Sequence, residues 1–254
     1  MKDKTDREKE AYDNETIRRD TYESVFSATR AFYFNYVKKK MQEMAMFADG
    51  KKVLELGSQS WYLLLWKNGI VPSDLTCINI SKVELEKGVE RARKTDLDVE
   101  FLIMDGNHLA FDDGSFDFVF GGGILHHLDY DNAIAEIHRV LKPGGRILFH
   151  EPLGANPVSK ITRIFTPQAR TRDEKPLGIK ELRAINKSFE CENCYEQFLS
   201  VPGGIISKIF FRNEKNFLTR IAYRIDRSID KHLPFMRPFF RYVIISGKRR
   251  ETLK

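Results

Sequence analysis

Short apolar segments alternate with amphipathic segments along residues 50–152. Val53–Leu56 and Phe118–Phe120 are mostly apolar runs, typical of strands that are buried on both faces of a sheet. The expected strands are Lys52–Leu56, Leu75–Ile80, Val99–Met104, Phe116–Gly121 and Arg146–Glu151, and the expected helices are Trp61–Asn68, Val83–Lys94 and Asp131–Leu141. Alternation of this kind predicts an α/β fold, with a parallel sheet covered by helices on both faces.

The segments on either side of this region have a different character. Residues 1–50 lack strand signals, and Thr16–Ala48 carries apolar and aromatic residues at helical spacing, so we expect an N-terminal helical cap over 1–50. A main domain over 51–254 follows, in which 151–240 would form loops and helices on the substrate side. Its expected elements are helices at Ala155–Phe165, Ile179–Asn186 and Phe217–Asp230, and strands at Cys191–Leu199 and Tyr242–Ser246.

Composition narrows the class of protein. Of 254 residues, 42% are apolar and 31% charged, as in ordinary globular proteins, and no stretch approaches the ~20 apolar residues of a membrane-spanning helix. Three cysteines and a charged start favour a cytoplasmic protein. The net charge of +6 is uneven, because residues 205–254 hold 13 Lys or Arg against 4 Asp or Glu. Such a basic region is either a solvated face or a contact for a phosphorylated substrate, anionic lipid or nucleic acid.

Polar and glycine-rich turns follow the expected strands. In open parallel sheets, ligands bind beyond the carboxyl ends of the strands. Gly57 allows close approach of the backbone to a ligand, Asn79 stands where nucleoside-binding folds place a ribose ligand, and Asp105 can accept a bond from an adenine amino group. The first turn lacks both the full glycine cradle and the lysine of a phosphate-binding loop, so phosphate is not its expected ligand.

These segments, in this order, resemble the class I S-adenosylmethionine (SAM)-dependent methyltransferases, in particular the branch of ubiquinone-biosynthesis-type and small-molecule enzymes. The resemblance covers roughly residues 50–152. It is carried by Val53–Gly57, Cys77–Ser81, Met104–Asp117, Leu125–Leu128, Arg139–Arg146 and Glu151-Pro152. It implies a Rossmann-like, doubly wound sheet of seven strands, mostly parallel with an antiparallel last strand, plus N-terminal helices and C-terminal helical insertions.

The resemblance also implies a set of SAM-binding residues. Glu55 would support the first loop, Asn79 would face the ribose, and Asp105 would bind the adenine amino edge. The full expected set is Glu55, Gly57, Ser58, Gln59, Asn79, Ile80, Ser81, Asp105, Gly106, Asn107, Gly121 and Gly122. This chain departs from the family where Gln59 and Trp61 replace glycines and where Asn79 replaces an acidic residue. An amide offers the ribose one acceptor and one donor, so we expect weaker binding than with a carboxylate. We expect Trp61 to pack in the core.

Three residues are candidates for catalysis. His126 and His127 follow the fourth strand, where a base would reach a hydroxyl acceptor, and a histidine suits that task at neutral pH. The alternative is that one histidine caps the strand end or stacks in the site. Glu151 ends the fifth strand and would orient a substrate hydroxyl, share the role of base, or cap the loop that follows it.

Candidate substrate contacts lie on two other segments. Arg170 and Arg172, on the polar loop Thr166–Leu177, suit a phosphate or carboxylate, and Tyr22 and Tyr33 belong to the N-terminal segment that would cover the site. We expect Cys191 and Cys194 to be buried thiols, His108 and His138 to be solvated, and no metal site.

The sequence therefore predicts an enzyme that uses SAM to methylate a small or medium-sized acceptor at oxygen. Candidate acceptors are a cell-surface glycan precursor, a phosphorylated or nucleotide-linked metabolite, and a secondary metabolite. The basic C-terminal region would suit an anionic acceptor or peripheral membrane contact. A non-catalytic SAM- or nucleoside-binding protein is the alternative. A nucleic-acid methyltransferase is a weaker one, and we do not expect a nucleic-acid partner.

Overall fold

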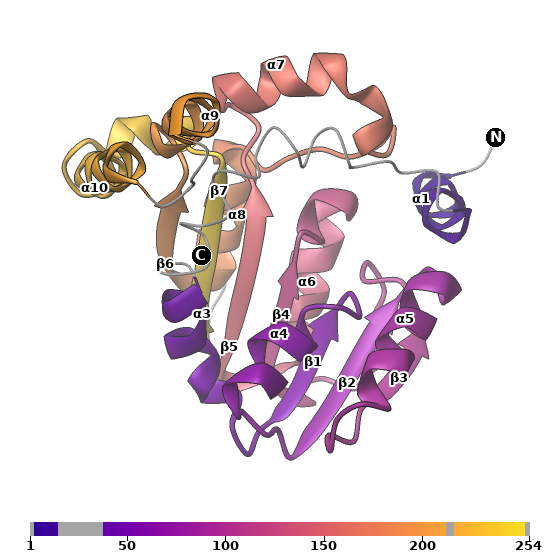
Figure 1. Ribbon diagram of the computed structural model, residues 1–254. Coiled ribbons are helices and arrows are strands. Elements are labelled where there is room, and N and C mark those ends of the chain that lie inside the picture. The colour runs from indigo at the N-terminus through magenta and orange to yellow at the C-terminus, as the bar shows by residue number, and fades with distance from the viewer. Residues whose placement is uncertain (1–2, 15–37, 212–215, 252–254) are drawn as a thin grey trace.

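A computed structural model describes residues 3–14, 38–211 and 216–251 (Figure 1). Its strands form one sheet of seven, in the order β3-β2-β1-β4-β5-β7-β6. Strand β1 pairs in parallel with both β2 and β4, whereas β7 is antiparallel to both β5 and β6. The bounds are β1 (Lys52–Leu56), β2 (Asp74–Asn79), β3 (Glu100–Ile103), β4 (Phe116–Gly122), β5 (Leu141–Pro152), β6 (Phe189–Glu196) and β7 (Tyr242–Arg249). The expected Rossmann-like sheet with an antiparallel last strand is confirmed.

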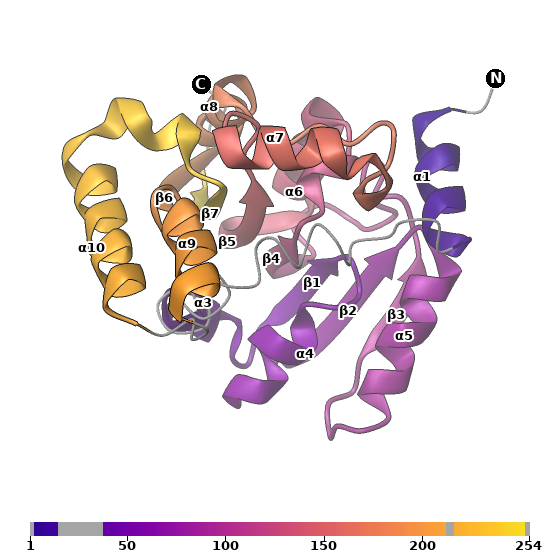
Figure 2. The ribbon, with the colours of Figure 1, turned by 45° about the horizontal axis from the view of Figure 1, so that its top comes forward.

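Helices cover both faces of this sheet (Figures 1 and 2). Helices α3, α4 and α5 lie on one face, and α6 and α8 lie on the other. The helices are α1 (Lys4–Asp13), α3 (Lys38–Ala45), α4 (Trp61–Leu64), α5 (Lys82–Ala92), α6 (Tyr130–Val140), α7 (Pro157–Phe165), α8 (Ile179–Ser188), α9 (Ser200–Phe211) and α10 (Phe217–His232). Short 3-10 turns are η2 (Met46–Ala48), η3 (Trp66–Asn68), η4 (Leu125–His127), η5 (Pro167–Ala169) and η6 (Pro234–Phe239).

The two faces of β1 build two cores. Leu54 and Leu56 join the apolar cluster beneath α6 and α8, while Val53 joins the cluster beneath α3 and α4. Side chains alternate along a strand, so one short strand feeds both clusters. Trp61 is fully buried in the second cluster, and its ring meets Phe101 edge-on at 6.4 Å. The expectation that Trp61 fills the core is confirmed.

Three elements differ from the sequence-based expectation. The predicted helix Trp61–Asn68 is divided into α4 and η3, and it ends where Gly69 adopts a φ of 69°. Helix α9 was not predicted, because its first turns contain Pro202 and two glycines, which are residues that normally interrupt helices. Helix α1 falls within the expected helical cap of residues 1–50, but its own bounds were not predicted, since its residues are almost all polar and the apolar pattern begins only at Thr16. No helix of the described residues is long and apolar enough to cross a bilayer.

Gly88 lets α5 lie close to the loop that follows β1. A Cβ atom at Gly88 would stand 2.7 Å from the Ser58 carbonyl oxygen and 2.7 Å from a Phe101 ring carbon. We expect Gly88→Ala to lower the free energy of unfolding by about 1–2 kcal/mol in urea denaturation, because the overpacking cost of about 1–3 kcal/mol exceeds the gain in helix propensity. Glu86→Ala, on the exposed side of the same helix, should change it by less than about 0.5 kcal/mol. A more stable Gly88→Ala protein would contradict this packing.

Candidate active site

The loop after β1 is held by one buried carboxylate. Glu55 is fully buried, and its Oε1 accepts the backbone N–H groups of Gln59 at 3.2 Å and Ser60 at 2.6 Å. The Cys77 thiol donates to Oε2 at 3.2 Å. Burial raises the pKa of Glu55 to about 7, and the hydrogen bonds from the loop oppose that rise. The expectation that Glu55 supports the first loop agrees with this geometry.

The loop itself needs only one residue with positive φ. Gly57 has a φ of 101°, and a Cβ there would meet no atom within 4 Å, so its backbone borders open space. Gln59 is not among the residues with positive φ, and its side-chain amide donates to the Glu84 carbonyl at 2.8 Å. Arg91 in turn donates to the Gln59 carbonyl at 3.2 Å. Contacts from α5 therefore hold this loop where other loops of this kind have further glycines.

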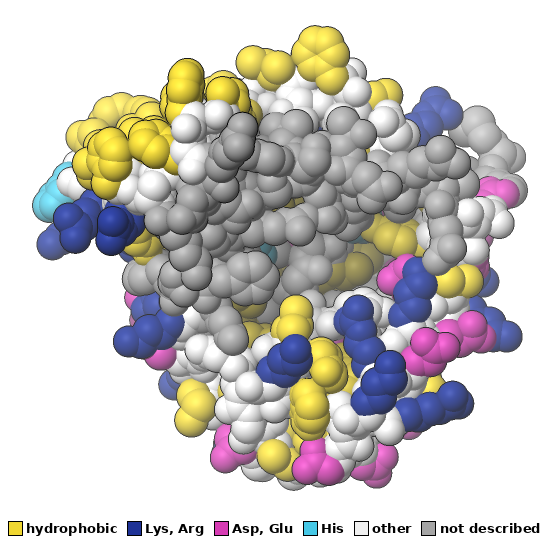
Figure 3. Space-filling model, viewed as in Figure 1, with side chains coloured by type: hydrophobic (Ala, Val, Ile, Leu, Met, Phe, Trp, Pro, Cys, Tyr) yellow, Lys and Arg dark blue, Asp and Glu magenta, His cyan; other side chains and the backbone are white. Residues whose placement is uncertain are grey.

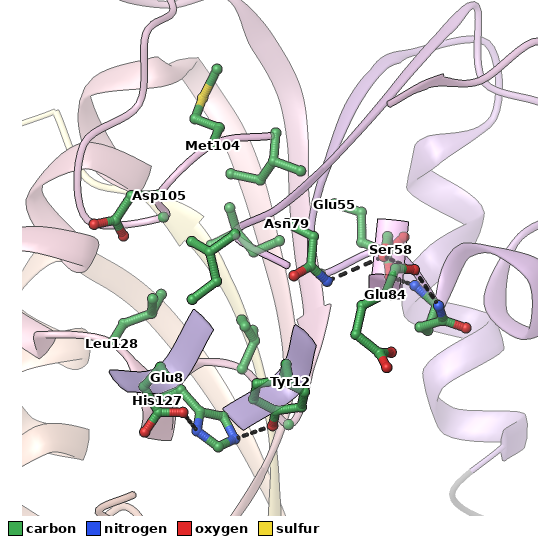
Figure 4. A pocket seen from close by; sticks show the side chains of 18 of the residues that line it. Glu8, Tyr12, Glu55, Ser58, Asn79, Glu84, Met104, Asp105, His127 and Leu128 are labelled. Atoms are coloured by element: carbon green, nitrogen blue, oxygen red, sulfur yellow. Dashed lines mark hydrogen bonds and ion pairs between the residues drawn. The ribbon is translucent and has the colours of Figure 1, made fainter. Parts of the chain in front are cut away.

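Asn79 lies at the end of β2 and faces the same space (Figure 4). Its Nδ2 donates to Ser58 Oγ at 3.2 Å, and its Oδ1 accepts the Ser81 N–H at 3.0 Å. Ser81 is buried; it caps α5 by accepting the Glu84 N–H and donates to Asp13 of α1 at 2.7 Å. The Asn79 side chain is therefore fixed in orientation before any ligand arrives.

A cavity opens at the carboxyl ends of β1, β2 and β4, where the strand order reverses. Asp105 lies on its wall and accepts the Asn107 N–H at 2.9 Å, while Met104 and Leu128 give that side an apolar surface (Figure 4). Ten of the twelve expected cofactor residues line it: Glu55, Gly57, Ser58, Gln59, Asn79, Ile80, Asp105, Gly106, Asn107 and Gly122. Ser81 and Gly121 do not, and Gly121 instead packs against the Leu56 carbonyl.

His127 also lines the cavity, between two residues of α1 (Figure 4). Its Nδ1 lies 3.0 Å from Glu8 Oε2, and its Nε2 lies 3.0 Å from the Tyr12 hydroxyl. Glu8 is 2% exposed and also accepts a hydrogen bond from Thr171. Burial pushes the pKa of Glu8 upward, but the hydrogen bonds from His127 and Thr171 outweigh it and hold the pKa below its ordinary value. A carboxylate, an imidazole and a phenol therefore form one chain of hydrogen bonds at the cavity wall.

His126 and Glu151 lie behind this wall and do not line the cavity. Glu151 is fully buried; it accepts the N–H groups of Ile124 at 2.9 Å and Leu125 at 3.0 Å, and it lies 2.8 Å from His126 Nδ1. Burial raises the pKa of Glu151 to about 7. Glu151 therefore holds the η4 turn that carries His127, rather than the loop that follows β5, and this contact positions His127.

Helix α1 crosses the rim of the cavity. Lys4 donates to the Leu128 carbonyl at 3.0 Å, the Thr5 hydroxyl donates to Asp105 at 3.3 Å, and Arg7 pairs with Asp173 at 2.7 Å. Glu8 and Tyr12 were not identified from the sequence as residues of the site. Their spacing of four residues, which puts both on one face of a helix, is the signal that would have found them.

None of the expected substrate-binding residues is found among the described residues that line the cavity. Arg170 and Arg172 are exposed and do not line the cavity, and Tyr22 and Tyr33 lie outside the described residues. The thiols of Cys191 and Cys194 are half-buried and buried, and burial raises the pKa of both.

His108 and His138 were both expected to be solvated, and the structure confirms this for His108 alone. His108 is exposed as expected, but His138 is partly buried against Phe189 and the Arg250 carbonyl, so it is not simply solvated. His126, His127 and Glu174 bring possible metal-ligand atoms within 4.8 Å of one another, although we expected no metal site. His127 Nε2 is already engaged by Tyr12 there.

Part of this chain is similar to known methyltransferases. Residues 54–149 match the family described as "Methyltransferase domain". Demethylmenaquinone methyltransferases of Staphylococcus epidermidis and Staphylococcus aureus are 33% and 34% identical to this chain over 114 residues, or 44% of it. The chain spans about half the length of these relatives, 47% and 46%.

Solved structures extend the likeness over most of the fold. A geranyl diphosphate C-methyltransferase of Streptomyces coelicolor A3(2), in complex with Mg²⁺, geranyl diphosphate and S-adenosyl-L-homocysteine, has a TM-score of 0.59 at 14% identity; the match covers 84% of this chain and 78% of that one. An N-methyltransferase of Bradyrhizobium japonicum in complex with S-adenosyl-L-homocysteine has a TM-score of 0.52 at 12% identity, with 85% and 86% covered. At these identities the likeness concerns the fold alone.

The raised pKa of Glu55 makes stability depend on pH. The folded protein holds this proton more tightly than the unfolded chain, so the stability contribution is complete below the unfolded pKa of 4.5 and is lost as pH rises toward about 7. Glu55→Gln should remove this loss, which is on the order of 3 kcal/mol for a fully buried group. Denaturant unfolding at pH 5 and pH 8 measures the difference. Glu190→Gln, exposed on β6, should keep the wild-type difference, and an unaltered difference in Glu55→Gln would refute the assignment.

Proposed function

We propose that this chain, which belongs to the class I SAM-dependent methyltransferase family, binds SAM in the cavity and methylates a small or medium-sized acceptor at a hydroxyl oxygen. The observation that carries the proposal is the Glu8–His127–Tyr12 chain of hydrogen bonds, because it sets a proton acceptor beside a nucleoside-shaped site. A hydroxyl needs such a group, since it must lose its proton as the methyl group arrives.

The cavity fits an adenosyl cofactor in the placement of its polar and apolar groups. Gly57 offers open backbone, Asn79 and Asp105 offer polar side chains at two neighbouring strand ends, and Met104 and Leu128 offer an apolar surface for a flat ring. SAM supplies a sulfonium-bound methyl group that is open to in-line attack. The remaining tasks, alignment and proton removal, belong to the protein.

The hydrogen bonds of His127 favour one arrangement of protons. Glu8 has a lowered pKa and is ionised at neutral pH, so it accepts a hydrogen bond from the Nδ1–H group of His127 and leaves Nε2 to act as the base. The hydroxyl group of the methyl acceptor then gives its proton to Nε2, directly or through the Tyr12 hydroxyl. The buried carboxylate stabilises the imidazolium that results. Glu151 keeps η4, and with it His127, in place.

The cavity wall bears on the class of acceptor. The described residues that line it include four carboxylic acids but neither lysine nor arginine. We therefore propose that the reacting end of the acceptor is uncharged. The anionic part of a glycan precursor or of a phosphorylated or nucleotide-linked metabolite would lie outside the cavity, where Arg170 and Arg172 are exposed.

A non-catalytic SAM-binding protein is the second candidate. It is favoured by the fact that both nitrogens of His127 and both polar atoms of Asn79 already have partners within the protein. Mass spectrometry of a metabolite extract incubated with protein and SAM separates the two, because only the enzyme yields a product heavier by one methylene. Binding of SAM without any such product would favour the second candidate.

Asn79 should control affinity for the cofactor. In calorimetric titration we expect Asn79→Ala to weaken SAM binding about tenfold through loss of a hydrogen bond, and Asn79→Asp to strengthen it about tenfold, since a carboxylate accepts charge-assisted bonds from both ribose hydroxyls. Asn186→Ala, exposed on α8, should bind as the wild type does. Absence of binding by both SAM and S-adenosyl-L-homocysteine would refute the proposed function.

His127 should control turnover without controlling binding. We expect His127→Ala to lower kcat by about 10²-fold or more, and Tyr12→Phe to lower it about tenfold, with SAM affinity changed by less than about threefold. His108→Ala replaces an exposed histidine and should leave turnover unchanged. Full activity of His127→Ala would exclude this histidine as the base.

A further inference from the structure

Exposed apolar side chains are concentrated in one part of the chain. Among the described residues, nineteen large hydrophobic side chains are exposed; four lie before residue 161, and fifteen lie between 161 and 239. The most exposed are Ile164 and Phe165 of α7, Ile209 and Phe210 of α9, and Phe235 of η6, at 67–77%. Chance scatter of surface apolar residues would not confine them to less than a third of the chain.

Twelve of these fifteen side chains lie on α7, α9, α10 and η6. Helices α7, α9 and α10 lie next to one another in both ribbon views, and α9 contacts α10. Figure 3 shows hydrophobic side chains gathered over these helices, with lysines and arginines at the margin. We call the outer surfaces of α7, α9, α10 and η6 the apolar face. Helix α7 begins at Pro157, soon after β5 ends at Pro152, so the apolar face lies at the same edge of the sheet as the cavity.

Helix α10 exposes basic residues but buries both of its acidic residues. Its exposed positions include Phe217 and Ile221 together with the cations Arg220 and Arg224. Its two acidic residues, Asp226 and Asp230, are buried. Cationic and apolar groups therefore share the outer surface, a combination typical of helices that lie in an anionic lipid interface.

The inward acidic residues have structural tasks. Asp226 is 2% exposed and accepts the N–H groups of Leu199 and Ser200 where α9 begins. Asp230 is 6% exposed and pairs with Arg227 at 3.2 Å and with Arg237 at 3.1 Å. Because the protein itself uses these carboxylates, they do not offset the charge of Arg220 and Arg224 on the outer surface.

We propose that the apolar face binds the surface of an anionic lipid bilayer, with its phenylalanines and isoleucines among the acyl chains and its arginines at the head groups. A second copy of the chain fits less well, since pairing would bring two cationic faces together. Nucleic acid would use the cations but leave the apolar side chains without a partner. Binding is peripheral, in keeping with the lack of a spanning helix among the described residues.

One consequence rests on the proposed function. A chain bound by this face holds the sheet edge that carries the cavity close to the lipid, so acceptors dissolved in or tethered to the bilayer would be within its reach. Lipid binding itself is independent of SAM and of turnover. The two proposals can therefore fail separately.

Sedimentation with vesicles tests the lipid proposal on the full chain. We expect binding to phosphatidylcholine vesicles that contain about one third phosphatidylglycerol, and at least tenfold weaker binding to pure phosphatidylcholine, because each basic residue near an anionic surface contributes about a fivefold increase in affinity. Arg220→Glu with Arg224→Glu should weaken binding to the anionic vesicles at least tenfold. Phe165→Ser with Phe210→Ser should do the same, since it removes two exposed aromatic rings that would enter the acyl chains.

Matched variants separate the apolar face from general effects of surface chemistry. Leu63→Ser with Ile103→Ser removes two exposed apolar residues elsewhere, and Arg93→Glu with Lys94→Glu reverses two exposed charges after α5. Both should bind anionic vesicles as the wild type does, and circular dichroism checks that each variant is folded. Equal loss in these controls, equal binding to neutral vesicles, or no binding to either vesicle would overturn the proposal. So would a dimer in solution that Phe165→Ser with Phe210→Ser dissociates.

Discussion

Two buried carboxylates make the site possible. Reversal of the strand order between β1 and β4 leaves the loops beyond these strands without neighbours to accept their N–H groups, and a buried N–H without a partner is costly. Glu55, in β1, accepts two such groups from its own loop; Glu151, at the end of β5, accepts two from η4. Both side chains are fully buried, and both have their pKa raised to about 7. These hydrogen bonds hold the loops around the cavity in place.

A third carboxylate connects the N-terminal helix to this frame. Glu8 reaches from α1 to His127, which η4 carries and Glu151 positions. The hydrogen bonds of His127 therefore depend on segments that are more than one hundred residues apart in the chain. The two neighbouring histidines have different surroundings. His126 faces Glu151 behind the cavity wall, whereas His127 faces the cavity and α1.

The sequence predicts the part of the structure that local patterns determine. Alternating segments give the sheet, and the residues at strand ends give most of the cavity wall, since Gly57, Asn79 and Asp105 lie at the carboxyl ends of three consecutive strands. The partners of those residues could not be predicted in the same way. Glu8 lies on a polar helix with little apolar periodicity, and its contact with His127 arises from tertiary packing alone. Arg170 has the chemistry of a substrate ligand, but its loop directs it to solvent.

The segment that matches known methyltransferases and the segments that carry the apolar face are different parts of the chain. The methyltransferase match ends at residue 149, and helices α7, α9 and α10 all follow it. The cavity that would hold the cofactor is thus built from the shared segment and α1, whereas the apolar face is built from residues that the match does not include. Charge is also uneven along the chain, because residues 205–254, which include α10 and η6, carry a net charge of +9 and the preceding 204 residues a net charge of −3. Exposed apolar side chains are costly to leave in water, and the proposed contact with anionic lipid would cover them while pairing the arginines with head groups.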